Sequence, residues 1–290
     1  MKSNYMNYFK EQKCYQWDKE KNVISITPTE IKEEFCLDQK GMDMFLKFDN
    51  PEIKLGKTLE VKSGKTKANI KICEQELVLP NMEYTNSFKL DVNKLKLANK
   101  FVSKTQQRPI LTGVNVNEGY IAATDSIFAY RTQCENDCNI TIASEFINIL
   151  NDALGEVEIK CNENTVSCEF NGTIYIGRLL VGIYPNINNV YKTPANTVVV
   201  NKEELKQLLS FSDTKNSFVT LSNNKVIIEG ENIVEAEIDL DINCEIYLAL
   251  DRVLTIINSI QETELKIGYD DGLHPLYIND DYLVLPVRRG

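Results

Sequence analysis

The stretch "IAATDSIFAYR" places two hydroxyl side chains beside a carboxylate, because Thr124 and Ser126 flank Asp125. Nucleophilic catalysis by a serine needs a base within hydrogen-bond reach, and histidine supplies that base most often. His274 is the only histidine of the chain, and it lies in "GLHPLYI", which is typical of a turn that enters a strand. A hydrolase that uses Ser126, Asp125 and His274 is one hypothesis. A structural turn, in which Asp125 accepts hydrogen bonds from nearby backbone amides, is the favoured one.

Other motifs that would indicate chemistry are incomplete. The "SGKT" of Ser63–Thr66 resembles the end of a phosphate-binding loop, but Leu59 stands where that loop needs a glycine. Strand-like sequence lies on both sides, so we expect a hairpin turn there. A zinc site needs about four convergent ligands, and the eight cysteines include no Cys-x-x-Cys pair. We therefore expect a protein that is not an enzyme, with reduced cysteines, no metal ion and no cofactor.

Composition and charge describe an ordinary globular protein. The 290 residues are 43% hydrophobic and 26% charged, and the net charge is −10. This charge argues against a surface that binds nucleic acid everywhere, but it allows a local basic patch. No apolar run of signal-peptide or membrane-spanning length follows the first residues. A cytoplasmic location is therefore the expectation.

One pattern recurs along the chain: a short strand, an amphipathic helix, then two or three more strands joined by Asn- or Gly-bearing turns. Because one such unit cannot bury both its helix and its sheet, the units should pair. The pattern predicts an α+β fold with helices on one face of antiparallel sheets. Three domains are expected, over residues 1–85 (truncated), 86–194 and 195–290. The units begin near Ile24, Phe88, Ile140, Val198 and Ile246. The first helix is expected to start at Pro28–Thr29, and the others are expected to be capped by Asn93, Ser144, Asn201 and Asp251.

One predicted helix, over residues 93–104, is basic and carries no acidic residue. A solvated helix face and a face directed at a polyanion both fit this pattern, since Lys and Arg bind phosphates irrespective of base sequence. Corresponding positions on two other predicted helices are also basic, although acidic residues lie beside them. The candidate DNA-facing residues are Lys94, Lys96, Lys100, Lys104, Lys202, Lys206 and Arg252.

Five motifs, in order and in agreement with the repeat, resemble the bacterial sliding clamp, the beta subunit of DNA polymerase III. The resemblance runs from about residue 24 to the C-terminus. It implies a DNA-clamp fold in which two three-domain chains close into a ring, with helices lining the hole and antiparallel sheets outside. The motifs are "LEVKSGKTKANIKI" (59–72), "RPILTGVNV" (108–116), "ATDSIFAYR" (123–131), "GRLLVGIYPNINNVYKTP" (177–194) and "YLVLPVRR" (282–289).

The resemblance also implies a hydrophobic pocket between the second and third domains that accepts short linear motifs of partner proteins. Two departures from the family pattern bear on peptide preference: Ser126-Ile127-Phe128 is more apolar than usual, and Asn189 stands where arginine is common. The matching positions are Leu111, Thr124, Ser126, Ile127, Phe128, Ala129, Pro185, Asn189, Val190, Leu273, Pro275, Leu283, Leu285, Pro286, Val287 and Arg288.

The resemblance favours a processivity clamp: a homodimeric ring around duplex DNA that tethers a polymerase and clamp-loader proteins. A clamp-derived adaptor or decoy, which binds clamp-motif peptides without encircling DNA, is the alternative. It is kept because roughly half of the first domain is expected to be absent or replaced by residues 1–22. The hairpin at 59–72, which joins the head-to-tail contact in the family, is expected to be present. No membrane partner is expected.

Overall fold

The computed structural model of the protein describes residues 5–74, 78–136, 138–211 and 217–288. The chain forms two compact units, and each is built from two segments of sequence. Unit 1 comprises Met1–Asn93 with Ile140–Val181, and unit 2 comprises Lys94–Asn139 with Gly182–Gly290. The expected second domain, 86–194, thus contributes strands to both units, and the division into three domains stays a prediction.

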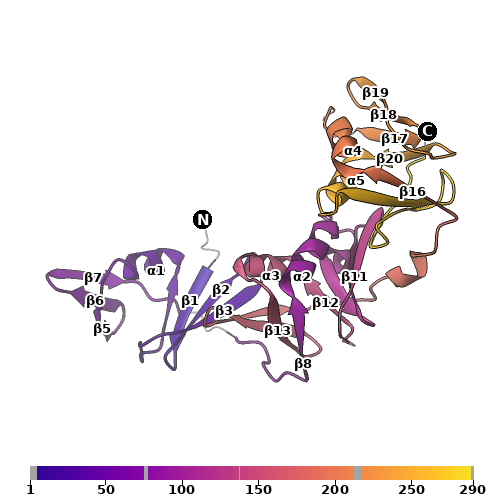
Figure 1. The fold of residues 1–290 in the computed structure, drawn as a ribbon. Helices are drawn as coiled ribbons and strands as arrows, with labels where there is room; N and C mark the ends of the chain where they lie inside the picture. The colour runs from indigo at the N-terminus through magenta and orange to yellow at the C-terminus, as the bar shows by residue number, and fades with distance from the viewer. Residues whose placement is uncertain (1–4, 75–77, 137, 212–216, 289–290) are drawn as a thin grey trace. The chain divides into compact units, whose positions relative to one another are not determined.

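The predicted repeat is present in five copies, each a strand, a helix and three strands (Figure 1). The first copy is β4 (Phe35–Asp38), α1 (Gln39–Phe45), β5 (Glu52–Leu55), β6 (Leu59–Ser63) and β7 (Thr66–Ile70). The second is β8 (Asn86–Asp91), α2 (Val92–Ala98), β9 (Gly113–Asn117), β10 (Tyr120–Thr124) and β11 (Phe128–Gln133). The third is β12 (Ile140–Ala143), α3 (Ser144–Ile149), β13 (Glu156–Cys161), β14 (Thr165–Phe170) and β15 (Thr173–Arg178). The fourth is β16 (Asn196–Asn201), α4 (Lys202–Leu209), β17 (Phe218–Ser222), β18 (Lys225–Glu229) and β19 (Ile233–Glu237). The fifth is β20 (Ile246–Ala249), α5 (Leu250–Ile257), β21 (Glu264–Tyr269), β22 (Leu276–Ile278) and β23 (Tyr282–Val284).

The N-terminal segment differs from the expectation. Three strands precede the first copy: β1 (Tyr5–Lys10), β2 (Lys13–Asp18) and β3 (Val23–Pro28). The poorly patterned residues 1–22 therefore contain two strands, and no helix begins at Pro28–Thr29. The chain runs instead into β4, where Phe35 and Leu37 are buried in the core of unit 1. Three strands therefore precede the first complete copy. No helix lies among them, whereas each of the five complete copies opens with a strand and a helix.

Unit 1 is organised around an antiparallel sheet of eight strands in the order β4-β1-β2-β3-β15-β14-β13-β8. Strand β3 pairs with β15 through Ile26 opposite Ile174. A separate three-stranded sheet, β5-β6-β7, forms the expected hairpin at 59–72 and turns through Gly64 in a left-handed conformation (φ +56°). A phenylalanine cluster joins this small sheet to β1 and β4, with the Phe9 and Phe35 rings stacked 4.7 Å apart.

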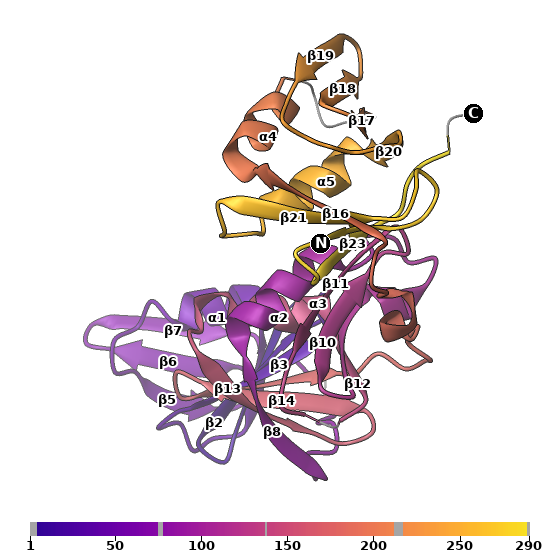
Figure 2. The same ribbon diagram turned by 45° about the vertical axis from the view of Figure 1, so that its right-hand side comes forward.

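Unit 2 holds strands in the order β9-β10-β11-β23-β22-β21-β16 and a four-stranded sheet β19-β18-β17-β20. Its helices α4 and α5 pack against one another and lie side by side (Figures 1 and 2). Strand β11 pairs with β23, which places Ala129 opposite Leu283. This pairing joins the "ATDSIFAYR" motif to the C-terminal motif in one sheet, although the two are far apart in sequence.

One predicted helix cap agrees with the structure, and the other predicted starts do not. Asn201 caps α4 by accepting a hydrogen bond from the Glu204 amide at 3.0 Å. Ser144 is the first residue of α3 and not its cap, because Ala143 occupies the cap position and no side chain caps the helix. The helix expected at 93–104 is α2, which begins at Val92 and ends at Ala98; a 3₁₀ turn, η1 (Asn99–Phe101), follows it. Asp91 accepts a hydrogen bond from the Asn93 amide at 2.7 Å, so the cap lies two residues before the expected one. Asp251 lies inside α5, not at its cap.

Candidate functional site

The turn between β10 and β11 is an Asx turn, as the sequence predicts. The Asp125 Oδ1 atom accepts hydrogen bonds from the amides of Ile127 (2.9 Å) and Phe128 (3.0 Å). The Thr124 hydroxyl donates to the carbonyl of Phe128 at 2.7 Å and accepts from the amide of Ser126 at 3.0 Å. The polar groups of this motif are therefore used to shape the backbone, and the turn directs Ile127 outward with 42% of its surface exposed.

Strand pairing brings the C-terminal motif beside this turn. Phe128 lies opposite Val284 in the β11–β23 ladder, and the amide of Leu285 donates to the carbonyl of Ile127 at 2.8 Å. On the other side of β23, Val284 lies opposite Leu276 of β22, which Pro275 precedes. The sheet thus collects three of the five segments that hold the predicted pocket residues.

The fourth segment, residues 184–191, is attached to the same sheet by three tyrosines and an arginine. The Tyr184 hydroxyl accepts from the amide of Thr124 (3.1 Å), and the Tyr277 hydroxyl donates to the carbonyl of Val190 (2.9 Å). The Arg131 guanidinium lies 3.9 Å from the centre of the Tyr191 ring. Burial raises the pKa of the Tyr191 hydroxyl, and the Arg131 charge opposes that rise only in part.

The predicted pocket residues divide into an exposed set and a buried set. The five buried ones are Leu111, Thr124, Phe128, Ala129 and Leu283, and the three half-buried ones are Pro275, Pro286 and Val287. The eight exposed ones are Ser126, Ile127, Pro185, Asn189, Val190, Leu273, Leu285 and Arg288. We name these eight residues and the three half-buried ones together the docking surface. Four of them, Ile127, Val190, Leu273 and Leu285, are large apolar side chains with 37–78% of their surface exposed.

The hydrolase hypothesis finds no support in these contacts. His274 Nδ1 lies 2.9 Å from the carboxylate of Asp271, and its side chain is 63% exposed. Asp125, the acid that would orient the base, is bound instead by backbone amides and by Arg252. Within the described residues no group of three or more His, Cys, Asp or Glu side chains could hold a metal ion. All eight cysteines are described, and no disulfide joins any of them.

The predicted DNA-facing residues fall into two groups by their contacts. Lys94 donates to the carbonyl of Gln133 at 2.8 Å, Lys202 donates to the carbonyl of Ile260 at 3.3 Å, and Arg252 is paired with carboxylates. Lys100, Lys104 and Lys206 make no salt bridge with another described residue. Lys100, in η1, and Lys104, which follows it, are exposed, and both lie beyond the end of α2. Lys96 on α2 and Lys206 on α4 are half-buried.

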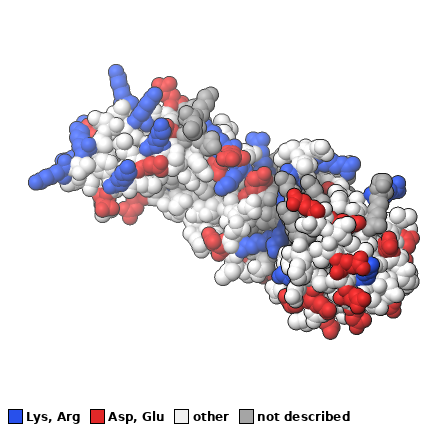
Figure 3. Space-filling view, turned by 90° about the horizontal axis from the view of Figure 1, so that it is seen from above, with Lys and Arg blue, Asp and Glu red and all other residues white. Residues whose placement is uncertain are grey.

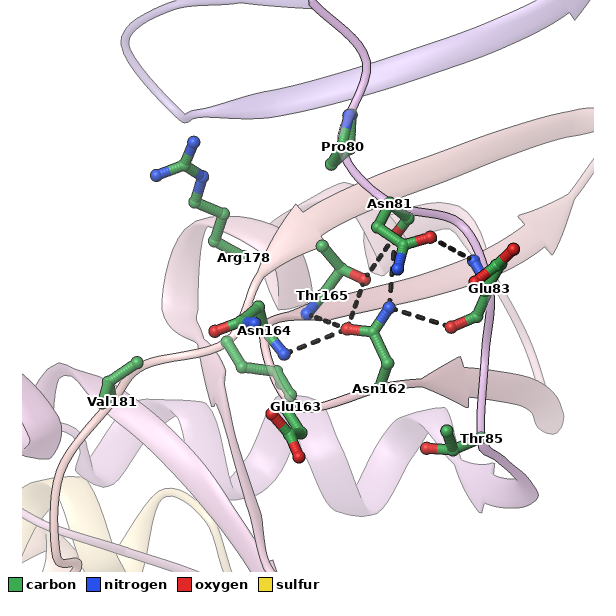
Figure 4. Close-up of a pocket in the computed structure, with 11 residues that line it drawn as sticks. Pro80, Asn81, Glu83, Thr85, Asn162, Glu163, Asn164, Thr165, Arg178 and Val181 are labelled. Atoms are coloured by element: carbon green, nitrogen blue, oxygen red, sulfur yellow. Dashed lines mark hydrogen bonds between the residues drawn. The ribbon is translucent and has the colours of Figure 1, made fainter.

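Unit 1 has an open pocket of about 700 Å³ beside the turn at 162–164 (Figure 4). Asn162 lies at its centre: the side-chain amide donates to the carbonyls of Asn81 (3.2 Å) and Glu83 (3.1 Å). Its oxygen accepts from the amides of Asn164 and Thr165. Asn162 therefore fastens the segment before β8 to the β13–β14 turn, and we assign it a structural role.

Four residues of the site were not predicted from sequence. Arg131, Tyr184 and Tyr191 hold the segment 184–191, and Arg252 binds the Asp125 turn. Three of them, Arg131, Tyr184 and Tyr191, lie inside the quoted motifs, so their position was noticed but not their role. The available signal was the aromatic content of "IYPNINNVY", which is high for a connecting segment.

Comparisons with known proteins agree with this geometry. No protein-family model matches the chain. The Beta sliding clamp of Bacillus subtilis is 25% identical over 271 residues, which cover 79% of this chain and 72% of that protein. The Beta sliding clamp of Staphylococcus epidermidis is 24% identical over 294 residues, 85% of this chain and 78% of that protein. The crystal structure of the DNA polymerase sliding clamp from Pseudomonas aeruginosa matches with a TM-score of 0.80 at 18% identity, covering 99% of this chain and 92% of that one.

The five repeats and the structural match define a protein with the DNA-clamp fold, as the sequence predicts. The named relatives add agreement in sequence over more than three quarters of the chain. The chain is therefore similar in sequence to the bacterial sliding clamps and shares their fold, which supports the resemblance to the family of the DNA polymerase III beta subunit. No helix among the described residues is long and apolar enough to cross a membrane.

Proposed function

We propose that this protein is a DNA sliding clamp without enzymatic activity. Two copies close into a ring around duplex DNA, and the docking surface tethers a polymerase and clamp-loader proteins by short linear motifs. The observation that carries the proposal is the assembly of the docking surface from four distant segments on the clamp fold. A surface with four exposed large apolar side chains and few charges fits leucine and phenylalanine side chains of a peptide.

Peptide binding is the first test. A short fluorescein-labelled peptide whose apolar side chains are leucine and phenylalanine is titrated with the protein, and anisotropy is measured. Ile127→Glu places a charge on the apolar surface and should abolish binding, because a desolvated carboxylate without a partner is costly. Ile233→Glu is the matched control, since Ile233 is also exposed in unit 2 and lies outside the docking surface. Equal affinities of the two variants would contradict the assignment of the surface.

Charge distribution supports head-to-tail pairing of two chains. The sheet β5-β6-β7 and the residues beside it carry Lys54, Lys57, Lys62, Lys65, Lys67 and Lys71 against Glu52 and Glu60. Strands β18 and β19 and the residues that follow carry Glu229, Glu231, Glu235, Glu237, Asp239 and Asp241 against Lys225. Figure 3 shows that lysines gather on one part of the surface and carboxylates on another. The basic surface of one chain and the acidic surface of another would attract each other as the two chains approach.

The same proposal assigns the exposed lysines of unit 2 to loose contacts with DNA phosphates. Such contacts are independent of base sequence and weaken with salt. Lys100→Gln with Lys104→Gln should lower retention on nicked circular DNA and reduce the salt dependence by about two counterions. Sedimentation of the free protein should show a dimer. Added salt should weaken the association of the two chains, because it screens the opposite charges that attract them. A chain that sediments only as a monomer at micromolar concentration and is never retained on circular DNA would contradict ring closure.

The adaptor or decoy remains the second candidate, because one observation favours it. The three N-terminal strands lack the strand and helix that open each of the five complete repeats. Peptide binding together with monomeric sedimentation and no retention on DNA would identify the decoy.

A further inference from the structure

The turn that carries Ile127 is held in a conformation that its sequence does not favour. Ser126 has a φ of +82°, in the left-handed region that a residue with a side chain rarely adopts. This conformation is unfavourable for a residue with a Cβ atom, and it persists only where the surroundings impose it. The local contacts that impose it are the hydrogen bonds of Thr124 and Asp125 described above.

Asp125 is itself held from outside the turn. Its Oδ2 atom lies 2.7 Å from Nη2 of Arg252, a residue of helix α5, and only 8% of the Asp125 side chain is exposed. The other terminal nitrogen of Arg252 donates to Asp251 at 2.7 Å. The guanidinium carbon also lies 4.9 Å from the centre of the Phe128 ring. Arg252 therefore contacts both the acid that caps the turn and the aromatic residue that ends it.

Phe128 connects this contact to the core of unit 2. Its ring lies 4.8 Å from that of Phe101, which in turn packs against Tyr130 and Tyr282. The guanidinium thus lies between a rigid aromatic cluster and a strained turn. Its planar shape suits both contacts, since one edge donates to a carboxylate while the face covers a ring.

We propose that Arg252 is a positioning residue of the docking surface: it fixes the Asp125 turn in the shape that presents Ile127 beside Leu285. This inference rests on the proposed peptide binding, and it replaces the expectation that Arg252 faces DNA. Two carboxylates within 2.7 Å already compensate the charge of Arg252, so little of it is available to a phosphate. The contact also joins α5 directly to the docking surface.

The test compares Arg252→Gln, Arg252→Lys and Asp125→Asn with Lys266→Gln. The control removes another ion pair of unit 2, between Lys266 and Asp280 at 3.2 Å, outside the docking surface. For the same labelled peptide, Arg252→Gln should weaken binding roughly tenfold, because the peptide must then order the turn itself. Arg252→Lys should recover only part of the loss, since lysine keeps the charge but not the planar fork. Lys266→Gln should bind like the unmodified protein.

Two further readouts separate positioning from a general loss of folding. Hydrogen exchange at the amides of Ile127 and Phe128 should accelerate in Arg252→Gln, while exchange in β17 and β18 stays unchanged. In a double-mutant cycle, Arg252→Gln with Asp125→Asn should weaken peptide binding less than the sum of the two single effects, because both break one contact.

Three outcomes would overturn the inference. Unchanged peptide affinity in Arg252→Gln would show that the turn does not need Arg252. Normal exchange at Ile127 and Phe128 with weaker binding would show that Arg252 touches the peptide itself. Loss of DNA retention with unchanged peptide affinity would return Arg252 to the DNA-facing set. If the unmodified protein binds no such peptide, the proposed function fails instead, and this result is distinct from all three.

Discussion

Phe101 lies in the core of unit 2, and we expect truncation of its side chain to lower the free energy of unfolding of that unit strongly. Its ring is 0% exposed and lies 4.8, 5.4 and 5.6 Å from those of Phe128, Tyr130 and Tyr282. A buried phenylalanine removes roughly 150 Å² from water, which at roughly 25 cal/mol per Å² corresponds to about 4 kcal/mol. Measured costs of about 3–5 kcal/mol for buried Phe→Ala agree with this figure. We therefore expect Phe101→Ala to lower the free energy of unfolding of unit 2 by about 4 kcal/mol.

The assay is urea unfolding followed by circular dichroism, with hydrogen exchange in β10 and β11 to assign the transition to unit 2. Phe211→Ala is the matched control, because Phe211 lies in the same unit with 63% of its surface exposed. This control should change the unfolding free energy by less than about 0.5 kcal/mol. A loss below about 1 kcal/mol for Phe101→Ala, or a loss equal to that of Phe211→Ala, would refute the packing that we describe.

Three other predictions concern single contacts. Gly177→Ala should destabilise unit 1 by about 1–3 kcal/mol in urea unfolding, because a Cβ there would lie 2.6 Å from the buried Phe146 ring; Gly56→Ala, which has only ordinary contacts, should be neutral. Asn201→Ala should cost about 1 kcal/mol by removing the cap of α4, and Asn201→Asp should restore it, so equal stabilities of the two variants would contradict the cap. Burial raises the pKa of the Tyr282 hydroxyl, so its contribution to stability is present below the ordinary tyrosine pKa of about 10 and is lost as pH rises through the higher folded value. The free energy of unfolding should therefore fall less steeply with rising pH in Tyr282→Phe than in the unmodified protein, which urea unfolding across the alkaline range would measure.

The N-terminal strands show where sequence patterns fail. In β1 the buried Asn7 interrupts the apolar alternation. Its side-chain oxygen accepts a hydrogen bond from Gln16 of the neighbouring strand at 3.1 Å, a contact that the local pattern does not reveal. The run "TPTEIKEEF" has a helix-like composition, yet Phe35 pairs opposite Phe9 and enters the phenylalanine cluster. Long-range pairing outweighs local propensity in both segments, and a local pattern carries no information about the distant partner.

The sequence by itself determined the repeat, the α+β class and the turn chemistry of Asp125. These depend on neighbours a few residues apart: the apolar period of a helix, the alternation of a strand and the reach of a side chain to its own backbone. Only the tertiary structure decided which predicted pocket residues reach the surface, and that Arg252 binds Asp125 instead of standing free. Those outcomes depend on strand order and on the meeting of α5 with the β10–β11 turn. Segments distant in sequence meet there because they share a core, and their local patterns do not record that contact.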